Sequence, residues 1–263
     1  MNKAVSDLID TQTEWFEGNM RKIARRVRNR LNTMLNQFDR SGGSLLNTPD
    51  NINRLNALYG SIIQELTAAG YTDLVAGLNA KENELLTKLR ATRPAYAVPL
   101  AFTETSQAAL AAFNGMWNAR IGNLGMDISR QIHGIVSESV FSGRTNYSLI
   151  KGISKLLDDD FVRYATTYVN TSRAKFIQMA EYEGVKSYEE DMFWIYEGPQ
   201  DDVTRPVCRE GTGMESNPIT DNAPYYTDTE RIDFENYSGS ERLYNCRHSF
   251  MLISPEYYKE HVR

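Results

Sequence analysis

Hydrophobic residues recur at three- and four-residue intervals along the first part of the chain, a pattern typical of amphipathic helices. The first series covers residues 5–38 and stops at Ser41-Gly42-Gly43. A second helix is predicted over Thr48–Gly70, with Thr48 as its cap and a proline in its first turn, and a third over residues 72–89. Because the connections are short, residues 1–93 are predicted to form a helical hairpin or small bundle.

Two prolines close together indicate an extended linker over residues 94–103. A long helix is then predicted over residues 105–141, followed by a short helix capped by Thr145 and another helix over residues 159–183. The single histidine of the long helix, His133, is expected to be an exposed or hydrogen-bonded side chain rather than a ligand.

The hydrophobic pattern changes near the C-terminus. Residues 192–196 are aromatic and β-branched, as is usual for a strand, and residues 247–253 supply a closing strand. The long stretch between them, residues 197–242, has no periodicity. The predicted fold class is therefore α+β: an N-terminal long-helix hairpin or bundle, then a mainly helical domain over residues 104–263 with a small C-terminal β-sheet.

Composition indicates a globular protein without a membrane segment. Of 263 residues, 41% are hydrophobic and 24% are charged. No apolar run approaches the roughly 18 residues that span a bilayer, and the N-terminus lacks the apolar core of a signal peptide. We therefore expect a protein that is made in a cytoplasm, where thiols stay reduced.

Charge is distributed unevenly. Residues 181–263 hold eight Lys or Arg against eighteen Asp or Glu, whereas a basic cluster lies within the first predicted helix. Such a cluster could contact DNA phosphates or an acidic protein surface, or it could be the solvated face of an amphipathic helix. Its members are Arg21, Lys22, Arg25, Arg26, Arg28 and Arg30.

Two short segments, residues 202–208 and 245–248, hold both cysteines and one of the three histidines. Cys246 and His248 are two residues apart, so they would share a face of a strand, and Cys208 lies in the long aperiodic stretch. A structural Zn²⁺ held by these three residues would clip that stretch, with Glu210, Asp221 or water as the fourth ligand. Two buried thiols beside an exposed histidine is the alternative, and a disulfide is a third that a reducing compartment disfavours.

Arginines next to small or acidic residues suggest internal clamps. Arg173, in a predicted helix, and Arg205, before a proline, could each pair with an acidic residue in a bidentate clamp. The acidic residues available for this are Glu197, Asp201 and Asp202. A catalytic or nucleotide site at Asp202 and Arg205 is the alternative, but the sequence has no Gly-rich phosphate loop and no Ser-His-Asp set, so we expect no enzyme. The residues predicted to act as structural clamps are Arg173, Asp202, Arg205 and Asn245.

Five short elements, in order, resemble the head-morphogenesis (minor head protein) family of tailed phages typified by phage Mu protein F. The resemblance covers about residues 145–255. Cys208 stands where the family usually has His, and His248 where it usually has a second Cys, an exchange that keeps the same class of zinc ligand. The elements are Tyr168-Val-Asn-Thr-Ser-Arg173-Ala174, Gly184-Val185, Trp194-Ile195, Asp202-Val-Thr-Arg-Pro206 and Asn245-Cys-Arg247.

The resemblance implies a virion protein rather than an enzyme. It would be made in the bacterial cytoplasm and lie inside the capsid at the portal vertex, in several copies, with a role in head morphogenesis, DNA packaging or DNA delivery. Its partners would be the portal protein, other capsid proteins and packaged double-stranded DNA. Residues 1–93 would dock through the apolar stripe and basic face of the first helix. The alternative is a phage-derived toxin or nuclease effector that uses the domain for delivery.

Overall fold

The computed structural model describes residues 3–185, 193–197, 249–254 and 256–257. The described chain is mostly helical, and contacts divide it into two compact units. The central unit comprises residues 13–79 and 117–169, and the terminal unit comprises residues 1–12, 80–116 and 170–263. None of the described helices combines the length and the apolar character needed to cross a membrane.

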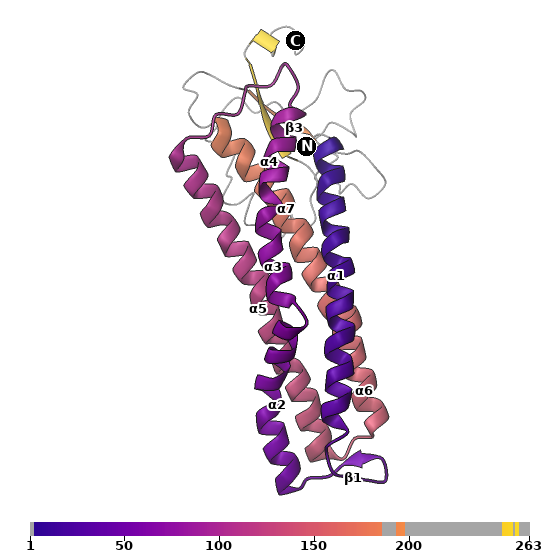
Figure 1. Ribbon diagram of the computed structural model, residues 1–263. Coiled ribbons are helices and arrows are strands. Elements are labelled where there is room, and N and C mark those ends of the chain that lie inside the picture. The colour runs from indigo at the N-terminus through magenta and orange to yellow at the C-terminus, as the bar shows by residue number, and fades with distance from the viewer. Residues whose placement is uncertain (1–2, 186–192, 198–248, 255, 258–263) are drawn as a thin grey trace. The chain divides into compact units, whose positions relative to one another are not determined.

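Helices make up the central unit (Figure 1). Its core is a continuous cluster of buried aliphatic and aromatic side chains from all of its long helices, which include Phe16, Ile62, Ile128 and Val169. The elements that contribute are α1 (Lys3–Leu35), α2 (Pro49–Ala68), α3 (Tyr71–Ala80), α5 (Glu104–Ser142), α6 (Asn146–Ser154), the π-helical segment η1 (Lys155–Phe161) and α7 (Val162–Val185).

Two helices begin at the capping residues that the sequence predicted. The hydroxyl of Thr48 accepts a hydrogen bond from the backbone N–H of Asn51 at the start of α2, and Thr145 does the same for Ser148 at the start of α6. Each cap satisfies a backbone donor that the first helical turn leaves without a partner. Both predicted caps are confirmed.

A small hairpin joins α1 to α2. Strands β1 (Arg40–Ser41) and β2 (Ser44–Leu45) pair antiparallel around Gly42 and Gly43, whose φ angles are 57° and 80°. Two consecutive positive φ values match the right-handed twist of paired strands, and glycine adopts them without steric cost. The sequence predicted only the end of a helix here, so the hairpin is an addition.

Close packing of α3 on α5 also depends on a glycine. The Tyr71 hydroxyl donates to the backbone carbonyl of Ile121, and a Cβ placed on Gly125 would lie 2.8 Å from the Tyr71 ring. Burial raises the pKa of the Tyr71 phenol, which therefore stays protonated and remains a donor.

The terminal unit combines helices with the predicted sheet. Strands β3 (Phe193–Glu197) and β4 (Ser249–Ile253) pair antiparallel, in a register that sets Phe193 opposite Ile253. This confirms a small antiparallel sheet in a mainly helical, α+β chain. Side chains from the start of α1, from α4 (Glu82–Ala91), from α5 and from α7 form a separate core: Val5, Ile9, Leu85, Leu89, Leu110, Phe176, Ile177 and Ala180.

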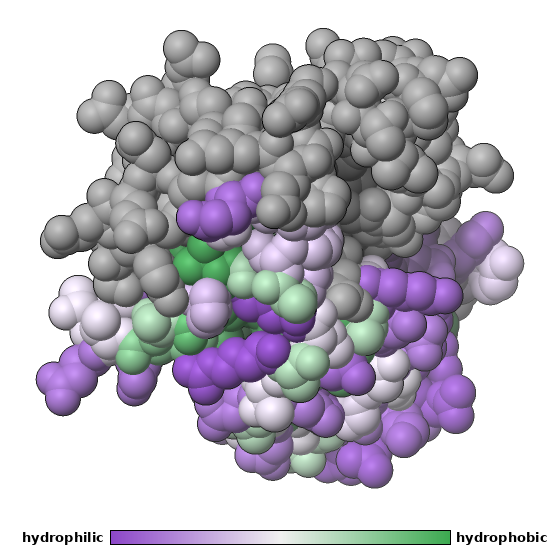
Figure 2. Space-filling model, turned by 90° about the horizontal axis from the view of Figure 1, so that it is seen from above, coloured by the Kyte–Doolittle hydropathy of each residue, from purple (hydrophilic) through white to green (hydrophobic). Residues whose placement is uncertain are grey.

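Large apolar side chains of the described residues are mostly buried in these two cores. Figure 2 shows a described surface that is largely hydrophilic or of intermediate hydropathy, with strongly apolar residues confined to a limited area of that view. The large hydrophobic side chains that stay exposed are Met116, Met126, Phe141, Tyr147 and Tyr164.

Two expectations differ from the structure, and a third remains a prediction. The helix predicted over residues 72–89 is two helices, α3 and α4, separated at Lys81, whose carbonyl accepts a hydrogen bond from the Gln12 side chain. The predicted linker at 94–103 is packed, since Ala97 and Val98 are buried and Ala97 bridges to Ile253. Each of the two units is made of segments that are distant in sequence but in contact. The predicted domain boundaries at residues 93 and 104 remain a prediction.

Candidate functional site

A buried ion pair lies between α4 and α7 in the terminal unit. The guanidinium of Arg173 donates from Nη1 to Glu82 Oε1 at 3.3 Å, with 2% of the Arg173 side chain and 14% of the Glu82 side chain exposed. Arg173 is the largest side chain in the described structure that is almost fully buried. The residue that the sequence predicted as a clamp therefore joins two helices.

A second buried pair joins the same two segments. Arg93, just after α4, donates from Nη1 to Glu181 on α7 and from Nε to the carbonyl of Val98. Only 6% of the Arg93 side chain and 5% of the Glu181 side chain are exposed. The position after α4 is thus fixed both to α7 and to the predicted linker.

The two pairs have reciprocal charges. Along α4 the acid, Glu82, precedes the base, Arg93, whereas along α7 the base, Arg173, precedes the acid, Glu181. Running the segments in the opposite direction would bring like charges together in a buried layer, which is strongly unfavourable. The arrangement therefore specifies that α4 and α7 run in the same direction.

Burial outweighs attraction within the Glu82–Arg173 pair. Burial raises the pKa of the Glu82 carboxyl, and the charge and hydrogen bond of Arg173 offset only part of that rise. Burial likewise lowers the pKa of the Arg173 guanidinium, with partial compensation from Glu82. A pair of this kind contributes more to the choice of helix register than to net stability.

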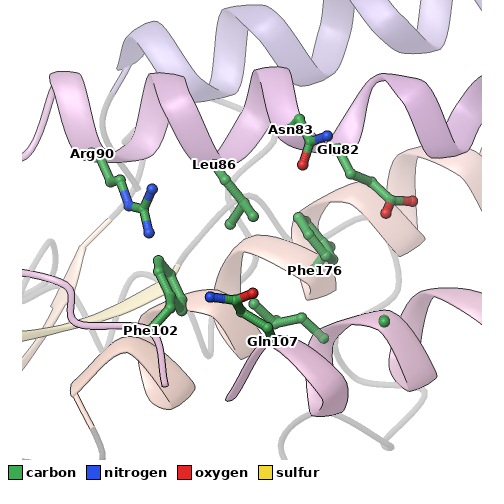
Figure 3. Close-up of a pocket in the computed structure, with 9 residues that line it drawn as sticks. Glu82, Asn83, Leu86, Arg90, Phe102, Gln107 and Phe176 are labelled. Atoms are coloured by element: carbon green, nitrogen blue, oxygen red, sulfur yellow. The ribbon is translucent and has the colours of Figure 1, made fainter. Parts of the chain in front are cut away.

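Next to the pair, a pocket of about 340 Å³ opens between α4 and the start of α5 (Figure 3). Its apolar lining comes from Leu86 on α4, Leu110 on α5 and Phe176 on α7. The polar side chains around it are Glu82, Asn83, Arg90 and Gln107, and the rest of the lining is Phe102 and Ala111.

The Arg90 guanidinium lies over the Phe102 ring, with its central carbon 4.7 Å from the ring centroid. Figure 3 shows Arg90 at one end of the pocket and Glu82 at the other. The site therefore has an apolar interior, an exposed cation at one end and, at the other, a carboxyl that is already paired with Arg173. This arrangement can bind a ligand in one orientation, but it holds no nucleophile with an adjacent base.

Gly184, another element of the family resemblance, lies where α7 meets the segment before α5. A Cβ on Gly184 would lie 2.8 Å from Leu100 Cδ2 and 3.2 Å from the Phe102 ring. The Gly184 carbonyl also accepts a hydrogen bond of 2.7 Å from the backbone of Ala101. A side chain at position 184 would force Leu100 and Phe102 to shift, and Phe102 is the ring that lies beneath Arg90.

The basic cluster of α1 is largely engaged within the central unit. Arg21 pairs with Glu17, Arg28 with Asp158 and Arg30 with Glu65, while Arg26 reaches the Ala69 carbonyl at 3.5 Å. Within the part of the chain that the structure describes, only Lys22 and Arg25 of the six have no such partner, and both are exposed. Contact with DNA or the portal remains a prediction, now centred on these two residues.

The apolar stripe of α1 does not form a docking surface. Val5 and Ile9 lie in the core of the terminal unit, and Phe16, Met20 and Val27 lie in the core of the central unit, all at most 1% exposed. The expectation that this stripe binds a partner is wrong, because both units need it for their own cores. The charged side of the helix is what remains accessible.

Several predicted site residues lie outside the described part of the chain. These include the whole predicted zinc site, so its geometry stays a prediction, and no group of three His, Cys, Asp or Glu side chains among the described residues could hold a metal ion. The residues concerned are Cys208, Cys246 and His248 of the zinc site and Asp202, Arg205 and Asn245 of the clamps.

Sequence reasoning identified Arg173 but missed its partner. Glu82 sits in an amphipathic helix whose other acidic residue, Glu84, is exposed, so its position carried no signal of burial. The Arg93–Glu181 pair joins residues far apart in sequence, which a single sequence cannot reveal. The stacking of Arg90 on Phe102 was missed for the same reason.

Comparison of the chain with known protein families, with curated protein sequences and with solved structures finds no match.

Proposed function

We propose that this chain is a structural minor head protein of a tailed bacteriophage, held inside the capsid at the portal vertex and active in head morphogenesis, DNA packaging or DNA delivery. The observation that carries the proposal is the ordered set of five sequence elements between Tyr168 and Arg247. The proposed role is one of assembly rather than catalysis.

Contacts at two of these elements support the proposal. Arg173 is buried in an ion pair with Glu82, and Gly184 leaves room for the close approach of Leu100 and Phe102. Both residue types have a physical reason at their positions, so two of the five elements contain residues that tertiary packing constrains. The third described element, Trp194-Ile195, lies on β3 of the sheet.

An assembly role also fits the engagement of α1. Because its apolar stripe is buried, α1 is an integral helix and not a detachable arm, so contacts with the portal or with packaged DNA would use its exposed charged side. The exposed cations Lys22 and Arg25 would take part in those contacts.

Particle fractionation tests the proposal. Bacterial lysates that contain the protein would be separated on a density gradient and probed with an antibody against the purified chain, before and after protease treatment. We expect the chain in DNA-filled particles, protected from protease until the particles are opened, in a copy number commensurate with a portal ring. Its confinement to the soluble fraction, with none in mature particles or procapsids, would exclude the structural role.

A further inference from the structure

We propose that the pocket between α4 and α5 docks a partner's peptide segment in which a large apolar side chain lies next to a carboxylate. The partner's identity as a head component rests on the proposed function, whereas the binding chemistry follows from the pocket itself. Four features of the pocket carry the inference: its size, the stacked Arg90, the position of that cation at one end and the adjoining face of α5.

The size and lining of the pocket select an apolar side chain. A volume of about 340 Å³ is at the lower end of the range for ligand pockets, roughly 300 to 1,000 Å³. Leu86, Leu110 and Phe176 offer an apolar surface on which an aromatic or large aliphatic side chain can be buried. Such an anchor next to a charged group is a common form of interaction hot spot.

Arg90 provides the charged group. Its guanidinium is stacked on Phe102 at 4.7 Å, an arrangement that orients the plane and leaves the N–H edge available for hydrogen bonds. Among the described residues, no carboxylate pairs with Arg90, and its side chain is exposed. A carboxylate that accepts two hydrogen bonds from this edge is the ligand group that the geometry favours.

The two ends of the pocket give the bound segment a direction. Glu82 and Arg90 lie two turns apart on α4, a rise of about 12 Å. Since the Glu82 carboxyl is already paired with Arg173 and Arg90 is exposed, the carboxylate of the partner belongs at the Arg90 end. Between them, Asn83 and Gln107 expose side-chain amides that make no hydrogen bond within the described structure and can bind a peptide backbone.

The adjoining surface of α5 permits close approach. Between Glu104 and Arg120 the helix carries no charged residue, and Ala108, Ala112 and Gly115 are exposed on it. A Cβ on Gly115 would meet nothing within 4 Å, so the chain itself does not require glycine there. Small uncharged side chains allow a peptide backbone to lie against the helix without the cost of desolvating a charge.

Fluorescence anisotropy with labelled peptides tests the proposal on the full chain. The probe is Gly-Ala-Phe-Glu-Ala-Gly, compared with two peptides in which Gln or Lys replaces Glu. We expect the Gln peptide to bind about tenfold more weakly or worse, since it lacks the charge-assisted hydrogen bonds, and the Lys peptide not to bind measurably.

Variants then assign the preference to the pocket. Arg90→Gln should abolish the preference for Glu over Gln, Arg90→Glu should transfer it to the Lys peptide, and Ala111→Trp should fill the site and block all three. Arg120→Gln is the matched control, because Arg120 is also exposed and stacked, over Trp117 at 5.1 Å, but does not line the pocket. Circular dichroism would confirm that each variant is folded.

Equal affinity for the Glu and Gln peptides, or the same loss in Arg120→Gln as in Arg90→Gln, would overturn the proposal, as would absence of any binding. Failure of the proposed function has a different signature. A chain that binds the Glu peptide through Arg90 but is missing from phage particles would retain the docking site and lose the assembly role.

Discussion

Arg173 and Glu82 form a buried ion pair in which burial shifts the pKa of each group against its charged form. The attraction of the partner offsets only part of that shift. Net stability therefore does not explain why the chain contains this buried pair. The reciprocal Arg93–Glu181 pair supplies a reason, since the two pairs together are compatible with only one direction and register of α4 against α7. Both helices also line the pocket, α4 through Glu82 and Arg90 and α7 through Phe176.

The pH dependence of stability tests the Glu82–Arg173 pair. Because the folded-state pKa of Glu82 is raised above its usual value of 4.5, folding favours the protonated carboxyl. Its stabilising contribution is complete below pH 4.5 and is lost as the pH rises through the raised folded-state value. Urea unfolding at a series of pH values should show this decline in the wild type and not in Glu82→Gln.

Arg173→Met sharpens the same test. Arg173 provides both influences that lower the pKa of Glu82, so its removal should raise that pKa further and extend the decline in stability to higher pH. The same pH profile for the wild type and Arg173→Met would show that Arg173 does not control the titration of Glu82.

The Arg93–Glu181 pair should be costly to break. Arg93→Met would leave the buried Glu181 carboxylate without this guanidinium, a change that typically costs about 3 to 5 kcal/mol. The control is Arg130→Met, which breaks an exposed pair with Asp127 and should change the free energy of unfolding by roughly 0 to 1 kcal/mol. Chemical denaturation measures both, and similar values for the two variants would argue against a buried charge layer.

Two glycines of α5 give a direct test of packing in the central unit. Gly125→Ala would place a methyl group 2.8 Å from the Tyr71 ring and should cost about 1 to 3 kcal/mol of stability. Gly122→Ala meets nothing within 4 Å and should stabilise the helix by about 0.5 to 1 kcal/mol. Thermal unfolding separates the two, and a destabilising Gly122→Ala would show that the exposed face of α5 is occupied.

The sequence predicted those parts of the fold that depend on local chemistry. Helices with a regular apolar stripe and a capping threonine, such as α2 and α6, begin where expected because Thr48 and Thr145 act on their own first turns. The hairpin at Gly42 and Gly43 was missed because strands of two residues are too short to show alternation. At the break between α3 and α4, the Lys81 carbonyl accepts a hydrogen bond from Gln12, which lies in another helix and which local sequence does not reveal.

The candidate site was harder to predict than the fold. Arg173 stood out as an arginine among small residues, but its partner Glu82 comes from a helix far away in sequence. The same holds for the approach of Gly184 to Leu100. Contacts between residues distant in sequence are set by tertiary packing, and neither composition nor periodicity predicts them.

Salt dependence tests whether α1 contacts DNA. If Lys22 and Arg25 touch phosphates, replacing either with Gln should lower the slope of log affinity against log salt concentration by about 0.9. Arg28→Gln should leave that slope unchanged and lower stability instead, because Arg28 is already paired with Asp158. Anisotropy of a labelled DNA duplex at several salt concentrations measures the slopes, and equal effects of all three substitutions would rule out a local DNA contact.

The predicted zinc site can be tested independently of the described structure. If Cys208, Cys246 and His248 hold a structural Zn²⁺, protein purified without chelator should contain about one zinc per chain by elemental analysis. Cys246→Ser should lose both the metal and thermal stability, because the binding energy of a structural metal is folding energy. His133→Gln is the control, since this histidine lies within α5 and should not affect the metal content.

Cys208→His distinguishes a ligand from a packed thiol. It replaces one zinc donor with another, and His is the residue that the phage family usually has at this position, so zinc content and the unfolding temperature should be retained. A thiol buried in an apolar environment would not tolerate the larger polar ring, and the same variant would then be destabilised. The zinc site would be excluded if the purified protein contained no metal and chelator did not change its unfolding temperature. Cys208 and Cys246 would then be ordinary thiols.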